Sequence, residues 1–447
     1  MPSVIPIMAS NTIGLDNRLE FLLFFSILFA MNNSVFKIDV YYNFLKLIML
    51  RKYRNLFCLL IICFFFSSSY GQNYNTKIIV GAERLEKYLY LIKGNSVAIV
   101  ANQTSMVGNV HLVDTLLSLG VNVVKVFAPE HGFRGNADAG EAIYDEIDIK
   151  TGIPIISLHG KTKRKPSKET LSDVDFVLFD IQDVGVRFYT YISTMHYVMK
   201  ACAEQNKTII VLDRPNPNGF YVDGPILKKE NTSFIGLHPV PIVHGMTIGE
   251  YATMIINEKW LGNDYRCMIK VVKCLNYSHT DYYRIPVPPS PNLPNMNSIY
   301  LYPSLCLFEG TNVSIGRGTE YPFQIYGSPF LNSTSYMFTP VSGPGSKYPK
   351  HKGKICKGYK LDSAQINNLI LKKQINYSWL TEMYKHTKAS PNFFRTDGFF
   401  KLLTGDKNIR IMLEKGRSAE QIRESYQKEL LEFKIIRRKY LLYPDFE

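Results

Sequence analysis

The chain has 447 residues, of which 46% are hydrophobic and 20% are charged. This length and composition are those of a folded protein with a sizeable core, and they exclude a disordered chain. The formal net charge is +14, but the basic residues are spread along the chain and form no stripe interleaved with aromatic residues. We therefore expect no nucleic acid as a partner, whereas an anionic polymer would suit the diffuse positive charge.

The N-terminal part predicts export. A basic segment at 49–54 is followed by an apolar run from Leu56 to Phe66 and by small polar residues up to Gly71. This order is typical of a secretory signal peptide. We interpret residues 1–48 as a mis-assigned upstream extension and 49–71 as the signal peptide, which predicts a periplasmic or secreted protein. A retained N-terminal membrane anchor is the alternative.

Residues 78 to about 260 alternate between apolar runs and helical patterns. The predicted strands are 96–100, 122–127, 154–157, 175–180 and 208–213, and the clearest helices are 110–119 and 190–204. Such alternation predicts an α/β fold, a Rossmann-like doubly wound and mainly parallel sheet. We expect this domain at 78–280, Pro/Gly-rich active-site loops at 281–330, and a smaller C-terminal α/β domain at 331–447 that closes with an amphipathic helix over about 418–439.

Polar segments rich in glycine and proline follow each predicted strand. They lie at 102–105, 128–135, 159–160, 182–187 and 214–217. The carboxyl ends of parallel strands share one sheet edge, where ligands bind in open α/β folds. No glycine-rich phosphate loop follows the first strand, so a nucleotide cofactor is not expected.

The motifs APEHGFRG, TGIPIISLHG, DIQDVGVRFYTYISTM, VLDRPNPNG, HGMTIGE, PPSPN and EGTNVSIGRGT stand in this order. In these segments the chain resembles the NamZ-type exo-β-N-acetylmuramidases, from about Gly81 to Tyr443. The resemblance implies a cofactor-free glycoside hydrolase that removes β-1,4-linked N-acetylmuramic acid (MurNAc) from the non-reducing ends of peptidoglycan fragments such as MurNAc-GlcNAc. It also implies an active site in the cleft between the two domains. The segment FFKLLTG at 399–405 departs from the Asp-containing segment expected there, away from the strand-end motifs.

Glycoside hydrolysis needs an acid and a second group that acts as a nucleophile or activates water. Glu130, in a Gly-flanked loop after a strand, is the first candidate for the acid/base, and the resemblance assigns catalysis to it. The structural alternative is a helix cap or a pair with Arg134. Glu309 and Asp183 are candidates for the second group, with Asp180 and Glu141 as competitors, whereas Asp213 is expected to be structural. Retaining and inverting stereochemistry both stay open, and the substrate's own N-acetyl group is a further candidate nucleophile.

The lactyl carboxylate of MurNAc calls for a cation, and arginine suits bidentate recognition. Arg187 and Arg317 are the candidates, followed by Arg134; each alternatively pairs with an acidic neighbour. Two tyrosines, Tyr189 and Tyr191, offer a face for a sugar ring, but their i, i+2 spacing near a helix start predicts that one belongs to the core. The remaining candidate substrate contacts are His131, Glu141, Gln182, His244, Asn312 and Ser314.

Several alternatives remain open from the sequence. The set His131, His159 and His244 matches no standard metal spacing, so we expect no metal. Cys267 and Cys274 form either a disulfide or two buried thiols. A hydrolase of another cell-wall bond lacks support because no G-x-S-x-G motif occurs, and a non-catalytic glycan-binding protein is the third hypothesis.

Overall fold

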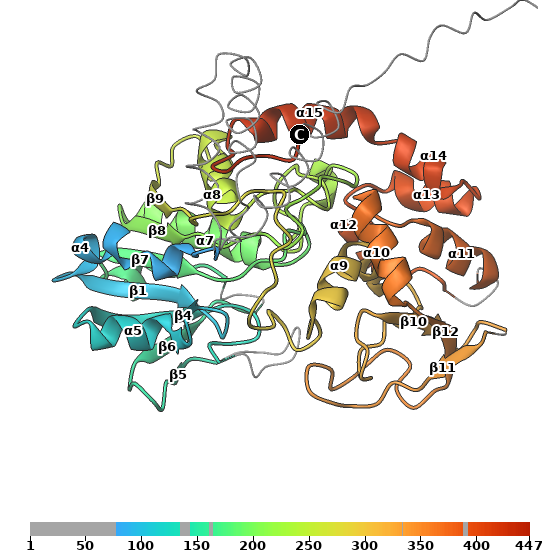
Figure 1. Ribbon diagram of the computed structural model, residues 1–447, viewed down its shortest axis with the longest axis horizontal. Helices are drawn as coiled ribbons and strands as arrows, with labels where there is room; N and C mark the ends of the chain where they lie inside the picture. Colours follow the sequence, from blue (N-terminus) through green and yellow to red (C-terminus); the bar gives the residue numbers. More distant parts are fainter. Residues whose placement is uncertain (1–76, 135–143, 161–163, 333, 388–391) are drawn as a thin grey trace, which may run out of the picture. The chain divides into compact units, whose positions relative to one another are not determined.

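The computed structural model describes residues 77–134, 144–160, 164–332, 334–387 and 392–447 (Figure 1). The predicted extension (1–48), the signal peptide (49–71) and Glu141 lie outside these residues. Residues 77–447 form one unit by their internal contacts.

A seven-stranded sheet has the order β5-β6-β4-β1-β7-β8-β9 (Figure 1). All neighbouring strands pair in parallel except the edge strand β5, which is antiparallel to β6. The strands are β1 (Ser96–Ala101), β4 (Asn122–Ala128), β5 (Glu146–Ile147), β6 (Pro154–Ser157), β7 (Phe176–Asp180), β8 (Thr208–Leu212) and β9 (Met268–Val272). The five predicted strands and the α/β class are confirmed, and β5 and β9 are additional.

Alternating side chains of the strands face two separate cores. Val97 and Ile99 of β1 pack with α4 (Leu89–Ile92) and α5 (Leu112–Ser118). Ala98 and Val100 point the other way, into the core that includes α7 (Tyr191–Glu204) and α8 (Ile248–Asn257). Because both faces are covered, the strands read as continuous apolar runs.

The second half of the chain begins with α9 (Met296–Leu305) and the 3₁₀ helix η5 (Cys306–Gly310), which interrupt the predicted loop region. An antiparallel sheet follows in the order β10-β12-β11, with strands Ile325–Ser328, Cys356–Lys360 and Tyr336–Phe338. The remaining helices are α10 (Ser363–Lys372), α11 (Ser378–Thr387), α12 (Phe399–Thr404), α13 (Asn408–Glu414), α14 (Ala419–Glu424) and α15 (Gln427–Arg438).

The expected single C-terminal helix is two helices, α14 and α15, which are separated at Ser425 and Tyr426. After α15 the chain returns to the large sheet. There the hydroxyl of Tyr443 donates to Asp213 Oδ2 at 2.6 Å, and the amide of Leu442 donates to Glu250 Oε1 at 2.7 Å. These contacts, of which that of Tyr443 is fully buried, attach the end of the chain to the strand-end loops.

Candidate active site

The strand-end segments converge as expected, through hydrogen bonds between them. Thr104 Oγ1 accepts from the amide of Gln182 at 2.9 Å, and Gln182 Nε2 donates to Pro215 O at 2.8 Å. Arg214 and Asp180, each at the end of a strand, form a buried ion pair at 2.6 Å. Asp180 is therefore occupied in holding the loops together, as is Asp213, which accepts from Thr247, Gly249 and Tyr443.

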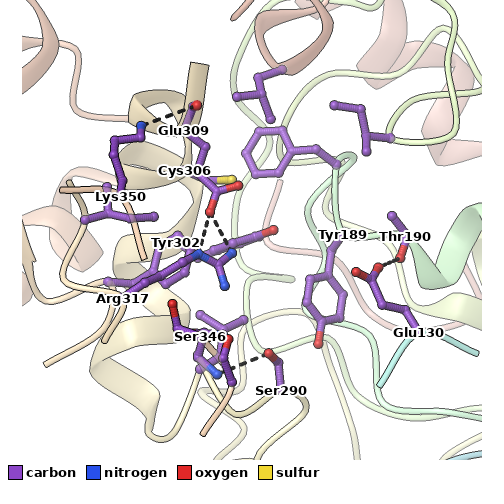
Figure 2. A pocket seen from close by; sticks show the side chains of 18 of the residues that line it. Glu130, Tyr189, Thr190, Ser290, Tyr302, Cys306, Glu309, Arg317, Ser346 and Lys350 are labelled. Atoms are coloured by element: carbon purple, nitrogen blue, oxygen red, sulfur yellow. Dashed lines mark hydrogen bonds and ion pairs between the residues drawn. The ribbon is translucent and has the colours of Figure 1, made fainter. Parts of the chain in front are cut away.

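A cavity of about 860 Å³ lies beside these segments and is lined by both halves of the chain. One wall carries Glu130, Thr190 and Tyr189, and the opposite wall carries Glu309, Arg317 and Tyr302 (Figure 2). Such a volume is in the range of cavities that hold small ligands. The cavity therefore brings together the two carboxylates that lead the sequence-based hypothesis.

Glu130 follows β4 and is placed by an unusual turn. The next residue, His131, has φ 72°, and Gly132 has φ 79°, so two consecutive left-handed residues reverse the chain. The hydroxyl of Thr190 donates to Glu130 Oε2 at 2.8 Å. Thr190 is the N-cap residue of the 14-residue helix α7, so the carboxylate lies at the positive end of that helix, where negative charge is favoured.

Glu309 lies in η5 and forms an ion pair with Arg317. Both Nε and Nη2 of Arg317 contact Glu309 Oε1, at 2.7 and 2.6 Å, and the two side chains are 24% and 23% exposed. The Arg317 guanidinium also lies over the ring of Phe323, 5.0 Å from its centroid. Arg317 thus holds Glu309 toward the cavity and itself lines it.

Lys350 fixes the turn that carries Glu309. Its ammonium donates to the carbonyl oxygens of Phe308 and Val313, both at 3.0 Å, and to that of Thr311 at 2.5 Å. Burial lowers the pKa of Lys350 to about 8, and the neighbouring Glu309 carboxylate offsets part of this effect. Phe308 O also accepts from the backbone amide and the hydroxyl of Thr311, at 2.9 and 2.8 Å, so Lys350 adds a donor that ties the end of η5 to the residues after it.

Tyr191 is 1% exposed and packs in the core, as predicted for one of the two tyrosines, but both side chains also border the cavity. Tyr189 precedes the helix, which begins at Tyr191, so helical spacing does not separate the two side chains. Both hydroxyls donate to the carbonyl oxygen of Pro289, at 2.9 and 3.1 Å. This carbonyl belongs to the predicted Pro-rich segment, which is thereby anchored beside the cavity.

Four predicted site residues are buried away from the cavity. Arg187 is fully buried and donates to the carbonyl oxygens of Pro225, Val240 and Leu403, so it joins distant segments instead of binding a carboxylate. The other three are also buried, outside the cavity lining: Asp183, Gln182 and His244.

Burial determines the protonation of two members of this group, Asp183 and His244. Burial raises the pKa of Asp183 to about 7, although its Oδ2 accepts from the amide of Gly185 at 2.6 Å. Burial lowers the pKa of His244 to about 3, so this imidazole is neutral at pH 7. Both side chains belong to the packed interior and not to the wall that a substrate would touch.

The remaining predicted residues are divided. His131 and Ser314 line the cavity. Arg134 instead forms an ion pair with Asp148 at 2.8 Å, which is the structural role that the sequence left open for this arginine. The partner in this pair is Asp148 and not Glu130. Asn312 lies outside the cavity lining, and its backbone N–H donates to Phe393 O at 2.7 Å.

Sequence reasoning missed several lining residues: Thr190, Tyr302, Ser346, Lys347, Tyr348, Lys350 and Arg395. Thr190 lies in the motif DIQDVGVRFYTYISTM, next to Tyr189. Its position as the N-cap of a helix that follows a strand end could have indicated a place near the site. Lys350 and its neighbours follow the loop region and belong to no recognised motif. Only the fold brings that segment to the cavity.

The described cysteines are all free and buried, which decides against the Cys267–Cys274 disulfide. Cys274 Sγ donates to Asp213 O at 3.2 Å. Within the described ranges, no three His, Cys, Asp or Glu side chains gather as potential metal ligands. No helix in the described part of the chain is long and apolar enough to cross a membrane.

Comparison with known proteins identifies relatives over most of the chain. The family model for the N-terminal part of the exo-β-N-acetylmuramidase NamZ matches residues 97–297, and the model for its C-terminal part matches 300–443. The peptidoglycan β-N-acetylmuramidase NamZ of Bacillus subtilis (strain 168) is 40% identical over 379 residues, which cover 80% of this chain and 89% of that protein.

Two solved structures share the fold, both DUF1343 family proteins from Bacteroides fragilis NCTC 9343. One is 48% identical, with a TM-score of 0.77, and the match covers 83% of this chain and 100% of that one. The other is 29% identical, with a TM-score of 0.68, and the match covers 82% and 99% of the two chains.

Proposed function

This chain belongs to the NamZ exo-β-N-acetylmuramidase family, and we propose that it hydrolyses the β-1,4 bond of MurNAc at the non-reducing ends of peptidoglycan fragments. MurNAc-GlcNAc is the smallest natural substrate of this reaction. The observation that carries the proposal is the placement of Glu130 and Glu309 on opposite walls of one cavity (Figure 2). Two carboxylates across a sugar-sized cavity are the minimal machinery of a glycosidase.

Glu130 is the proposed general acid. Proton transfer to the leaving oxygen requires a carboxyl group within hydrogen-bond reach of the substrate. The hydrogen bond from Thr190 to Oε2 helps to orient this side chain. His131, the next residue, lies at the same wall and is placed to contact a sugar hydroxyl.

Glu309 is the proposed second carboxylate. Its ion pair with Arg317 holds the carboxylate at the cavity wall. In that position it can serve as a nucleophile, as a base that activates water, or as a group that orients the substrate's N-acetyl. The configuration of the released sugar distinguishes retention from inversion. Arg317 is the one of the three predicted arginines that lines the cavity, and its remaining N–H donors make it the candidate for the lactyl carboxylate.

The proposed setting is the turnover or recycling of cell-wall fragments outside the cytoplasm, in the periplasm or the medium. The support is the basic, apolar and small-residue pattern at 49–71. Fractionation of cells that produce the tagged protein tests the location. Retention in the cytoplasm would contradict it.

The enzymatic test compares para-nitrophenyl β-MurNAc with its β-GlcNAc analogue. We expect nitrophenol release from the MurNAc compound only, together with free MurNAc from MurNAc-GlcNAc detected by mass spectrometry. Equal release from both aryl glycosides would contradict a pocket selective for the lactyl group. No release from any MurNAc substrate would refute the proposed activity.

A further inference from the structure

A long stretch of the C-terminal half carries positive charge without any acidic residue. No Asp or Glu occurs between Glu320 and Asp362, whereas six lysines occur there: Lys347, Lys350, Lys352, Lys354, Lys357 and Lys360. Part of this stretch, at 345–350, lines the cavity. One side of the cavity is therefore built from a segment whose field attracts anions.

Within this stretch the chain passes from the cavity interior to solvent in two residues. Ser346 is 8% exposed and Tyr348 is 80% exposed, although both line the cavity. A lining residue with so little of its surface covered lies at the rim. Its aromatic ring is thus presented to whatever extends out of the cavity.

Two ammonium groups flank this ring. The Nζ atoms of Lys347 and Lys352 lie 5.7 and 5.9 Å from the ring centroid of Tyr348, within the range of cation–π attraction. The ring and the two cations form one surface that combines a flat apolar face with positive charge. Such a surface is complementary to a sugar ring that carries carboxylates.

We propose that Tyr348, Lys347 and Lys352 form a leaving-side subsite, in which the sugar after the cleaved bond lies against the tyrosine ring. The two lysines bind carboxylates of the stem peptide or of the next lactyl group on the same fragment. The inference rests on the proposed function and adds to it the class of leaving group: an anionic saccharide that continues beyond the first sugar.

The direction of the chain through the cavity supports this assignment. Glu309 and Arg317 are about three-quarters covered, and Glu130 lies on the wall opposite them (Figure 2). The cleaved MurNAc must lie between the carboxylates, in the interior. In an exo-acting enzyme the rest of the fragment then leaves through the opening, where Tyr348 stands.

The experiment compares three substrates: MurNAc β-fluoride, which has no leaving-side sugar, MurNAc-GlcNAc, and MurNAc-GlcNAc-MurNAc-tripeptide. For Tyr348→Ala in the full chain we expect kcat/KM to fall about tenfold on the two saccharides, and less than twofold on the fluoride. Tyr348→Phe keeps the ring and retains kcat/KM. For the double variant Lys347→Gln, Lys352→Gln, we expect a loss mainly on the peptide-bearing substrate and a weaker salt dependence.

Tyr90 provides a matched control, because it is 67% exposed, has Lys270 Nζ 5.0 Å from its ring centroid and lies outside the cavity lining. We expect Tyr90→Ala to behave as the wild type on all three substrates. Equal losses on the fluoride and the saccharides in Tyr348→Ala, or no loss on any, would overturn the subsite. A wild-type protein inactive on all three would instead refute the proposed function itself.

Discussion

Replacing Lys350 by methionine tests how the turn that carries Glu309 is held. The substitution keeps an unbranched side chain of similar length and removes the ammonium. Three carbonyl oxygens, those of Phe308, Thr311 and Val313, then lose their common donor. Two of these residues flank Glu309 closely, so the position of its carboxylate depends on them.

The magnitude follows from the contacts. A hydrogen bond to a charged group contributes about 1.5–3 kcal/mol, but burying the ammonium costs part of that gain. For three such bonds we expect a net destabilisation of about 3 kcal/mol. A displacement of Glu309 on the order of 1 Å would lower kcat about a hundredfold, with a smaller change in KM.

Urea unfolding and steady-state kinetics on MurNAc-GlcNAc measure the two effects. Lys357→Met is the control. Lys357 lies in the same stretch without acidic residues, between Glu320 and Asp362, and donates to one carbonyl oxygen, Asn332 O, at 2.7 Å in a hydrogen bond that is exposed to solvent. We expect its kcat to be unchanged. A wild-type kcat for Lys350→Met would refute the idea that this lysine positions Glu309.

The same contact predicts a pH dependence. The pKa of Lys350 is lowered to about 8 by burial; Glu309 raises it, and Arg395 and Arg317 lower it. Above pH 8 the Lys350 ammonium becomes a neutral amine with one N–H donor fewer. The carbonyl oxygens around Glu309 are then bound less tightly, and kcat falls. We expect this alkaline decline in the wild type and its absence in Lys350→Met.

Three further substitutions separate structural from catalytic residues. The folded pKa of Asp183, about 7, lies above its ordinary 3.8. The folded chain therefore binds this proton more tightly, and the stability that it contributes falls as pH rises from about 4 to 7. Asp213, with a pKa raised to about 6, adds a slope of the same sign, so Asp183→Asn should reduce the difference in unfolding free energy between pH 5 and 8 and keep kcat. Loss of kcat at full stability would place Asp183 in catalysis after all. Arg187→Met removes a donor from three carbonyl oxygens, of which Val240 O keeps the backbone amide of Leu227. The substitution should lower the unfolding free energy by about 3 kcal/mol without a selective rise in KM. A stable variant with raised KM would return Arg187 to the substrate. Thr190→Val removes the hydroxyl that donates to Glu130 and should lower kcat about tenfold. Thr190→Ser keeps the hydroxyl and should retain the wild-type kcat. Equal kcat values in the two variants would show that this hydrogen bond does not contribute to catalysis.

The fold was largely predictable because its strands are buried on both faces. Short continuous runs of β-branched residues, such as 208–213, are typical of strands that are buried on both faces. The strand β9 was missed because its residues are mostly half-buried, with Met268 52% exposed, so its pattern is weaker. The break between α14 and α15 was missed because the apolar spacing continues across Ser425 and Tyr426.

The site was predictable only where local chemistry signals it. Glu130 and Glu309 stand in motifs rich in glycine at the ends of elements, and both reach the cavity. Arg187 stands in an equally suggestive motif, but its partners are carbonyls from 38 to 216 residues away. Lys350 acts through the same kind of long-range contact, which no local pattern reveals.

The most direct test of the central claim is the activity of Glu130→Gln on two substrates that differ in leaving group. Hydrolysis of MurNAc-GlcNAc needs an acid to protonate the departing oxygen, whereas MurNAc β-fluoride has a leaving group that needs far less assistance. We predict that Glu130→Gln loses activity on the disaccharide by at least about a hundredfold and keeps most of the rate of fluoride release in the first turnover, which needs little acid assistance whether the mechanism retains or inverts. Equal activity of variant and wild type on the disaccharide, or equal losses on both substrates, would contradict Glu130 as the general acid.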